Sequence, residues 1–182
     1  MKKIALDQIQ SLFKAMSEDA ALYLPVDTSA GADFKQYEDG VLWSGALNTN
    51  RSAKDFFFPQ TENMVDFKVE GKNIEILPPT PMEEDFVVFG VRACDARSFE
   101  LLDKVFLSDP VDTYYKNRRE HGVVVTLCCN KPAETCFCTS FGIHPENPGG
   151  DVACWQDDTN LYLQANTKAG EELLQKVDSV LE

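Results

Sequence analysis

The residues in this sequence best suited to chemistry are its cysteines, and most of them lie close together. Cys94 follows an apolar run, Cys128 and Cys129 end a second apolar run, and Cys136-Phe137-Cys138 comes shortly after. Cysteine thiolates act as nucleophiles, redox groups and metal ligands. Cys154 stands beside a tryptophan, a position typical of packing in the core rather than of a ligand.

Composition favours a metal or redox role for these cysteines. Six cysteines in 182 residues are too few for a disulfide-built secreted domain. The chain opens without an apolar signal core, and no stretch approaches the roughly 20 apolar residues of a membrane span. We therefore expect a cytoplasmic protein without membrane insertion, in which clustered thiols bind metal or exchange electrons.

The charge balance argues against nucleic acid as a partner. The chain has 17 basic and 30 acidic residues and a net charge of −13, which opposes attraction to phosphate backbones. The length predicts a single domain over residues 1–182. Pro78, Pro79 and Pro81 predict a join between an amino-terminal lobe, about 1–80, and a second lobe, about 81–182.

Two apolar runs must position the cysteines. Residues 86–91 and 122–127 lack polar alternation, as strands buried on both faces of a parallel sheet do, and 96–107 has helical spacing. This βαβ pattern brings the carboxyl ends of both strands to one sheet edge. The expected fold is α/β, with a mixed, partly parallel sheet, flanking helices and a cysteine loop at the carboxyl edge of the strands.

The remaining segments give weaker patterns. Residues 6–20 predict an amphipathic helix, 51–60 a short helix that places phenylalanines in the core, and 18–39 an exposed region of short strands and turns. Residues 114–120 predict a polar connection. Asp95 is expected to cap the helix that follows it.

Four thiolates are the usual ligand set of a [4Fe-4S] cluster and also of structural zinc. Zinc sites favour cysteine pairs two to four residues apart. This chain instead has one Cys-x-Cys pair, the remote Cys94, and Cys129, which is separated from Cys136 by six intervening residues. The spacing favours the cluster, and zinc and a dithiol redox pair remain alternatives. Arg92, nearby, would favour a buried anion; Arg118 and Arg119 are expected to pair with surface carboxylates.

Four motifs, in the same order, resemble one electron-transfer family. It comprises the iron-sulfur beta subunit of cytoplasmic sulfhydrogenases and the A subunit of anaerobic sulfite reductase, of the 4Fe-4S dicluster type. The resemblance covers most of the chain and is closest from Arg51 to Gly142. The motifs are Arg51-Ser52-x-Lys54-Asp55-Phe56-Phe57-Phe58-Pro59-Gln60-Thr61-Glu62, Phe89-Gly90-Val91-Arg92-Ala93-Cys94-Asp95-Ala96, Tyr114-Tyr115-x-x-Arg118-Arg119-Glu120 and Cys129-x6-Cys136-Phe137-Cys138-Thr139-Ser140-x-Gly142.

The resemblance implies a cofactor, its ligands and its partners. The family cysteines fall on Cys94, Cys129, Cys136 and Cys138, leaving Cys128 and Cys154 outside the pattern. Partners would be a flavin- and NAD(P)H-binding subunit and a further iron-sulfur, hydrogenase-type, sulfite-reductase-type or heterodisulfide-reductase-type subunit. Longer members continue into a ferredoxin-like segment with two more cluster motifs, which the sequence given lacks.

The function expected from these residues is electron transfer in anaerobic metabolism. The chain would be a non-catalytic subunit of a cytoplasmic oxidoreductase complex, with one [4Fe-4S] cluster relaying single electrons. Phe137 and Pro132 are expected to shape a dry pocket around it. The alternative is a zinc-stabilised assembly module, and a third possibility is a dithiol switch at Cys128-Cys129 or Cys136-x-Cys138.

Overall fold

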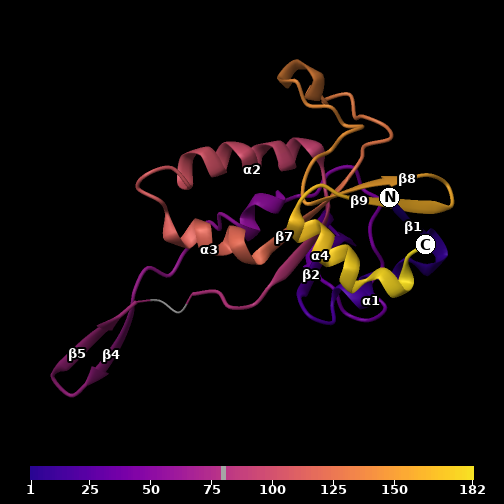
Figure 1. Cartoon of the computed structure of the whole chain (residues 1–182). Helices are drawn as coiled ribbons and strands as arrows, with labels where there is room; N and C mark the ends of the chain where they lie inside the picture. The colour runs from indigo at the N-terminus through magenta and orange to yellow at the C-terminus, as the bar shows by residue number, and fades with distance from the viewer. Residues whose placement is uncertain (79–80) are drawn as a thin grey trace.

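A seven-stranded mixed sheet forms the body of the protein (Figure 1). The computed structural model describes residues 1–78 and 81–182. The sheet has the order β1-β9-β8-β7-β6-β2-β3, and β4 and β5 form a separate hairpin. The strands are β1 (Lys2–Ala5), β2 (Ala21–Thr28), β3 (Gly31–Gln36), β4 (Asp66–Glu70), β5 (Asn73–Leu77), β6 (Phe86–Val91), β7 (Gly122–Leu127), β8 (Val152–Gln156) and β9 (Asn160–Ala165).

The predicted α/β class and the predicted pairing of the two apolar strands are confirmed. β6 and β7 are direct parallel neighbours, with Phe86 opposite Gly122 and Val88 opposite Val124. β2 continues the parallel set beyond β6, and β8 continues it beyond β7. β1, β3 and β9 pair antiparallel at the margins. The carboxyl ends of four neighbouring parallel strands therefore share one edge.

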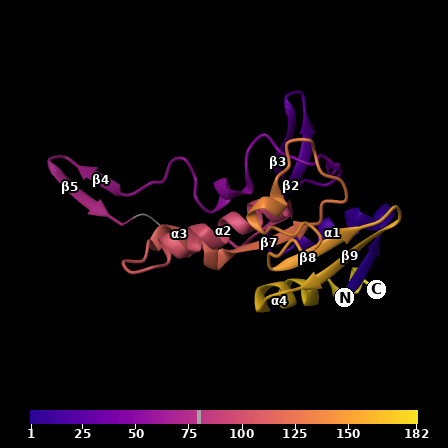
Figure 2. The ribbon, with the colours of Figure 1, turned by 90° about the horizontal axis from the view of Figure 1, so that it is seen from above.

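Helices cover both faces of the sheet, as Figure 2 shows from above. They are α1 (Ile9–Met16), α2 (Ala93–Phe106), α3 (Thr113–His121) and α4 (Lys168–Lys176), with short 3-10 turns at Leu6–Gln8, Ala53–Phe56, Cys138–Phe141 and Asp178–Val180. Val87 and Phe89 of β6 join a core with α1 and α4, whereas Phe86 and Val88 join a second core with α2 and α3. This alternation explains why β6 has no polar position.

Several elements differ from the sequence-based expectation. The first helix is shorter than expected because a 3-10 turn precedes Ile9 and the chain enters β2 at Ala21. The exposed region expected over residues 18–39 is wrong for β2, which lies inside the sheet with Leu22 and Leu24 buried and Pro25 within the strand. The expected polar connection is helix α3, capped by the Asp112 side chain. Asp95 lies in the first turn of α2 rather than at its N-cap, which is Arg92.

The proposed join between two lobes falls partly outside residues 1–78 and 81–182, which the structure describes. Pro79 lies outside the described residues, so the lobe boundary stays a prediction. Strands from either side of it share the seven-stranded sheet, because β2 pairs with β6. No helix within residues 1–78 and 81–182 is long and apolar enough to cross a membrane.

Candidate metal centre

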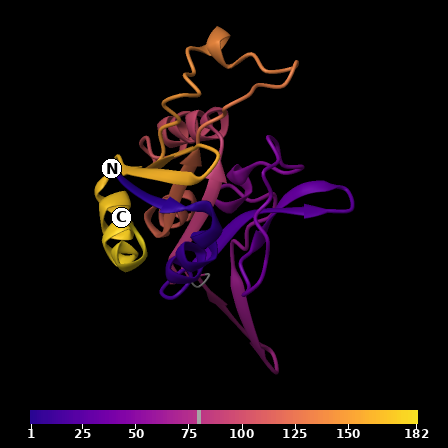
Figure 3. The same ribbon diagram turned by 90° about the vertical axis from the view of Figure 1, so that its right-hand side faces the viewer.

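The cysteines of interest come from three segments at the carboxyl edge of the sheet. Cys94 lies in the first turn of α2, directly after β6, and Cys129 follows the end of β7. Cys136 belongs to the loop beyond β7, and Cys138 begins the 3-10 turn. In Figures 1 and 3 this orange loop rises above the sheet, from the edge where β6 and β7 end. The parallel pairing of β6 and β7 brings the first two segments together.

Electrostatics link the four thiols. Burial raises the pKa of Cys94, and the carboxylate of Asp95 and negative charge at Cys138 and Cys129 raise it further. Burial also raises the pKa of Cys129, and charge at Cys138 and Cys136 adds to the rise. Negative charge at the neighbouring cysteines therefore disfavours ionisation of Cys94 and Cys129, so several thiolates together need a cation to compensate them.

Arg92 supplies positive charge at this edge and also joins three segments. Its guanidinium donates to the carbonyls of Ala46 (2.8 Å) and Leu47 (3.0 Å) in the amino-terminal half, and of Cys128 (3.3 Å) beyond β7. The same cation opposes the rise in the pKa of Cys129 and of Cys128. Arg92 thus fixes the end of β7 against the start of α2 through backbone contacts.

The loop around Cys136 and Cys138 is open, which corrects one expectation. Phe137 is 65% exposed and Pro132 is exposed as well, so neither shapes a dry pocket in this structure. Phe137 packs only loosely, with its ring centroid 5.6 Å from that of Phe141, which is itself exposed. The loop that carries these rings is rich in short polar residues and lies on the surface, so it offers no apolar core in which the rings could be buried.

The two remaining cysteines differ from each other. Cys154 is fully buried in the core beneath α1 and α4, as the sequence predicts, and burial raises its pKa strongly. Cys128 is half-buried beside Cys129, and its pKa is raised by burial and then by the charge of Cys129.

The first and second motifs meet at Asp95, a contact that the sequence pattern did not predict. The Asp95 carboxylate accepts hydrogen bonds from Ser52 Oγ (2.9 Å) and from Lys54 Nζ (3.2 Å). Asp95 is adjacent to Cys94, so residues 52–54 are held against the start of α2. One indication of this contact was present in the sequence: Ser52 and Lys54 belong to the first matched motif, and Cys94 and Asp95 belong to the second.

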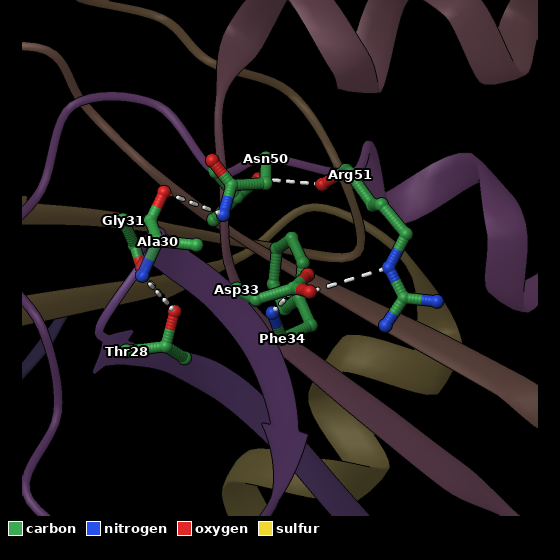
Figure 4. Close-up of polar contacts among 8 residues, drawn as sticks. Thr28, Ala30, Gly31, Asp33, Phe34, Asn50 and Arg51 are labelled. Atoms are coloured by element: carbon green, nitrogen blue, oxygen red, sulfur yellow. Dashed lines mark hydrogen bonds and ion pairs between the residues drawn. The ribbon is translucent and has the colours of Figure 1, made fainter.

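The segment just before these residues is fixed to the β2–β3 hairpin (Figure 4). Asn50 donates from its side chain to the carbonyl of Ala30 (3.2 Å) and from its backbone to Ala32 (2.8 Å). Arg51 pairs with Asp33 at 3.2 Å. These contacts cover the outer edge of β3 and hold the segment that offers Ala46 and Leu47 to Arg92.

Arg118 and Arg119 pair with carboxylates, as expected. Arg118 forms a two-pronged contact with Glu62, and Arg119 forms one with Asp103. Arg119 also lies over the rings of Phe57 and Phe99, at 5.1 and 5.7 Å. The third motif therefore packs against the first motif, through Glu62 and Phe57. Its two arginines are paired with carboxylates and not with the cysteines.

The donor set fits an iron-sulfur centre in its chemistry. Charge at the other cysteines affects the pKa of Cys94 and of Cys129, and a guanidinium and the amino end of a helix lie beside them, which are features that favour bound thiolates. In the part of the chain that the structure describes, no group of three or more His, Cys, Asp or Glu side chains is gathered closely enough to hold a single metal ion.

The resemblance predicted from the motifs is confirmed by comparison with curated proteins. The chain is 28% identical, over 175 residues and 94% of its length, to sulfhydrogenase 2 subunit beta of Pyrococcus furiosus. It spans half the length of that relative, consistent with an amino-terminal portion. No family model matches the chain, and no solved structure matches it.

Proposed function

We propose that this protein is an electron-transfer subunit of a cytoplasmic oxidoreductase complex, with one [4Fe-4S] cluster held by Cys94, Cys129, Cys136 and Cys138. The observation that supports the proposal is the parallel pairing of β6 and β7, because it brings the strand ends that precede Cys94 and Cys129 to one edge of the sheet, and the loop of Cys136 and Cys138 follows β7 directly. Ligands of open α/β sheets bind at this edge. Similarity to a protein named as a sulfhydrogenase subunit supports the same chemistry.

In this proposal the chain's own residues hold and tune the centre. The four thiolates would be the ligands, and the cluster, when bound, supplies one-electron oxidation and reduction. Arg92 offsets part of the negative charge and fixes the Cys129 segment by its carbonyl contacts. Asp95, held by Ser52 and Lys54, keeps the first turn of α2, and with it Cys94, in place.

The proposed partners follow from the resemblance. One would bind flavin and NAD(P)H, and another would carry further iron-sulfur or catalytic groups of hydrogenase, sulfite-reductase or heterodisulfide-reductase type. We propose this subunit as a relay between the two, working in anaerobic metabolism, because its cysteines offer electron-transfer ligands and the relative it matches is named as a sulfhydrogenase subunit.

Anaerobic purification followed by iron and sulfide analysis and electron paramagnetic resonance tests the proposal. We expect about four irons per chain and a reducible cluster signal. Cys94→Ser and Cys138→Ser should lose most of the iron, while the matched control Cys128→Ser keeps it, because Cys128 lies outside the proposed ligand set. One equivalent of zinc without iron would instead support the assembly module, and metal-free protein with a titratable dithiol would support a redox switch.

A further inference from the structure

The β4–β5 hairpin has two chemically different faces. Its antiparallel register sets Phe67 opposite Ile76 and Val69 opposite Ile74, so these four side chains share one face. Lys68 and Glu75 lie opposite each other on the other face, with the remaining charged positions of β4. The apolar face is open to solvent: the exposed fractions are 70% for Phe67, 73% for Ile76, 56% for Val69 and 69% for Ile74.

Nothing in the described chain covers this apolar face. The hairpin is a sheet of its own, with no third strand. It extends away from the body on the side opposite the cysteine loop (Figures 1 and 3). The Tyr114 hydroxyl donates to the carbonyl of Met64 (3.0 Å) at its base, which leaves the strands themselves free. A lone hairpin is marginal in water, so an exposed apolar face on one indicates a binding surface.

The size and charge of the surface argue against a second copy of this chain as the occupant. The exposed parts of the four side chains amount to roughly 500 Å². Two copies face to face would bury on the order of 1,000 Å², below the range of stable interfaces. Each copy also carries a net charge of −13, so two copies repel each other.

Charge at the base of the hairpin indicates what does bind. A groove of about 850 Å³ lies between this base and α3, and Glu83 and Glu84 line it. Both carboxylates are exposed, and neither forms an ion pair with the described residues. A complementary partner has an apolar surface for the hairpin face and lysine or arginine side chains for the acidic groove.

We propose that the β4–β5 hairpin is a docking arm for a different subunit, whose contact surface is apolar and bordered by basic residues. The inference rests on the proposed function only in taking this chain to be one subunit of a complex. It assigns the interface to the end of the molecule remote from the cysteines, so the two ends can be tested separately.

The test uses the tagged chain isolated anaerobically from its native cells with whatever is bound to it. A photo-crosslinking amino acid replaces Phe67, and the control places it at Leu101 of α2, which is also more than half exposed. We expect position 67, and not position 101, to give an adduct with one other polypeptide, identified by mass spectrometry. Adducts with a second copy of this chain, or no adduct above the control, would overturn the proposal.

Substitutions supply the second measurement. Phe67→Ser with Ile76→Ser should reduce the amount of that polypeptide at least tenfold, and Glu83→Lys with Glu84→Lys should reduce it severalfold. The control pair Leu101→Ser and Val105→Ser, at positions of α2 that are 53% and 63% exposed, should not. Undiminished retention by either variant, or equal loss in the control, counts against the docking arm. Iron content is measured on the same samples, so an empty cluster site with a bound partner would contradict the proposed function alone.

Discussion

Arg92 links the segments on either side of the candidate cysteine site through several hydrogen bonds of one side chain. Its guanidinium donates to carbonyls on both sides of the cysteine edge. The planar fork of arginine suits several acceptors at once, whereas a lysine ammonium is a point charge. Replacing it leaves partly buried carbonyls unpaired and the Cys129 segment unrestrained.

We expect Arg92→Gln to lower the free energy of unfolding by about 2–4 kcal/mol, because charge-assisted hydrogen bonds to partly buried groups are lost. Arg97→Gln is the matched control, since Arg97 pairs only with Glu100 on the helix surface, and it should cost about 0.5 kcal/mol or less. Urea unfolding under anaerobic conditions measures both.

The reduction potential of the loaded centre distinguishes the effect of the charge of Arg92 from the effect of its carbonyl contacts. If Arg92 also balances a bound anion, Arg92→Lys should keep the potential of the loaded centre close to that of the wild type, while Arg92→Gln lowers it. Equal stability and equal potential in the glutamine variants of Arg92 and Arg97 would show that the carbonyl contacts do not matter.

At the scale of elements, the packing of α2 on β6 depends on the phenylalanines of the first motif. Phe57 is fully buried, with ring centroids 5.3 Å from Phe86 and 4.9 Å from Phe99. Its neighbour Phe58 is 47% exposed and stacks on Phe106 at 4.7 Å. Of these two adjacent phenylalanines, Phe57 therefore faces the core and Phe58 faces the surface.

Phe57→Ala should lower the free energy of unfolding by about 3–5 kcal/mol, because it opens a cavity between two strands and a helix. Phe58→Ala is the matched control and should cost about 1 kcal/mol, since its ring is half in water already. Denaturant unfolding compares the two, and similar losses would show that the buried cluster is less tightly packed than described.

The turn between β8 and β9 carries a pH-sensitive carboxylate. The amides of Thr159 and Asn160 and the hydroxyl of Tyr162 donate to Asp157, which lowers its pKa to about 2. Because the pKa in the folded state lies below the unfolded value, this carboxylate stabilises the fold above about pH 4. Its contribution is lost as the pH falls through about 2.

Asp157→Asn should therefore reduce the dependence of stability on pH between about 4 and 2, since the amide keeps the acceptor oxygen but does not titrate. Unfolding midpoints in urea over this range measure the effect against the wild type. Parallel curves for the two proteins would mean that Asp157 ionises alike in the folded and unfolded chains.

The elements that the sequence predicted are those whose burial is uniform. β6 is apolar at every position, and β7 at every position but Thr126, because both faces of the two strands pack on helices. The burial of β2 was missed because acidic residues surround it and Pro25 suggests an end, yet parallel pairing with β6 buries Leu22 and Leu24. α3 was missed because Tyr115 is its one buried residue, so its amphipathic pattern is faint.

The candidate centre was predictable in part for the same reason. Strand ends place Cys94 and Cys129 together from local pattern alone, because parallel neighbours share an edge. The contacts of Arg92 with Ala46 and Leu47 are long-range and go to backbone carbonyls, which carry no mark in the side-chain sequence. No periodicity could have indicated them.

The whole molecule combines a well-packed sheet with two extensions at opposite ends. The cysteine loop and the β4–β5 hairpin both project from it, and both expose phenylalanine side chains. Local stability follows contact density and burial, so these extensions should open far more often than the strands between them.

Hydrogen exchange followed by mass spectrometry tests this division. In the isolated, metal-free chain, amides of residues 66–77 and 130–143 should exchange at least tenfold faster than those of β6 and β7, whose side chains are almost wholly buried. Slow exchange in the hairpin of the isolated chain would mean that it is covered without any partner.

The buried thiol of Cys154 can report how often the folded protein unfolds. Its sulfur lies in the core beneath α1 and α4, with no exposed surface, while every other cysteine reaches solvent at least in part. In metal-free protein an alkylating reagent can label the other five thiols directly. It can label Cys154 only after the sheet unfolds. The rate at which Cys154 is labelled, followed by intact mass spectrometry, therefore measures global unfolding under native conditions without any introduced probe.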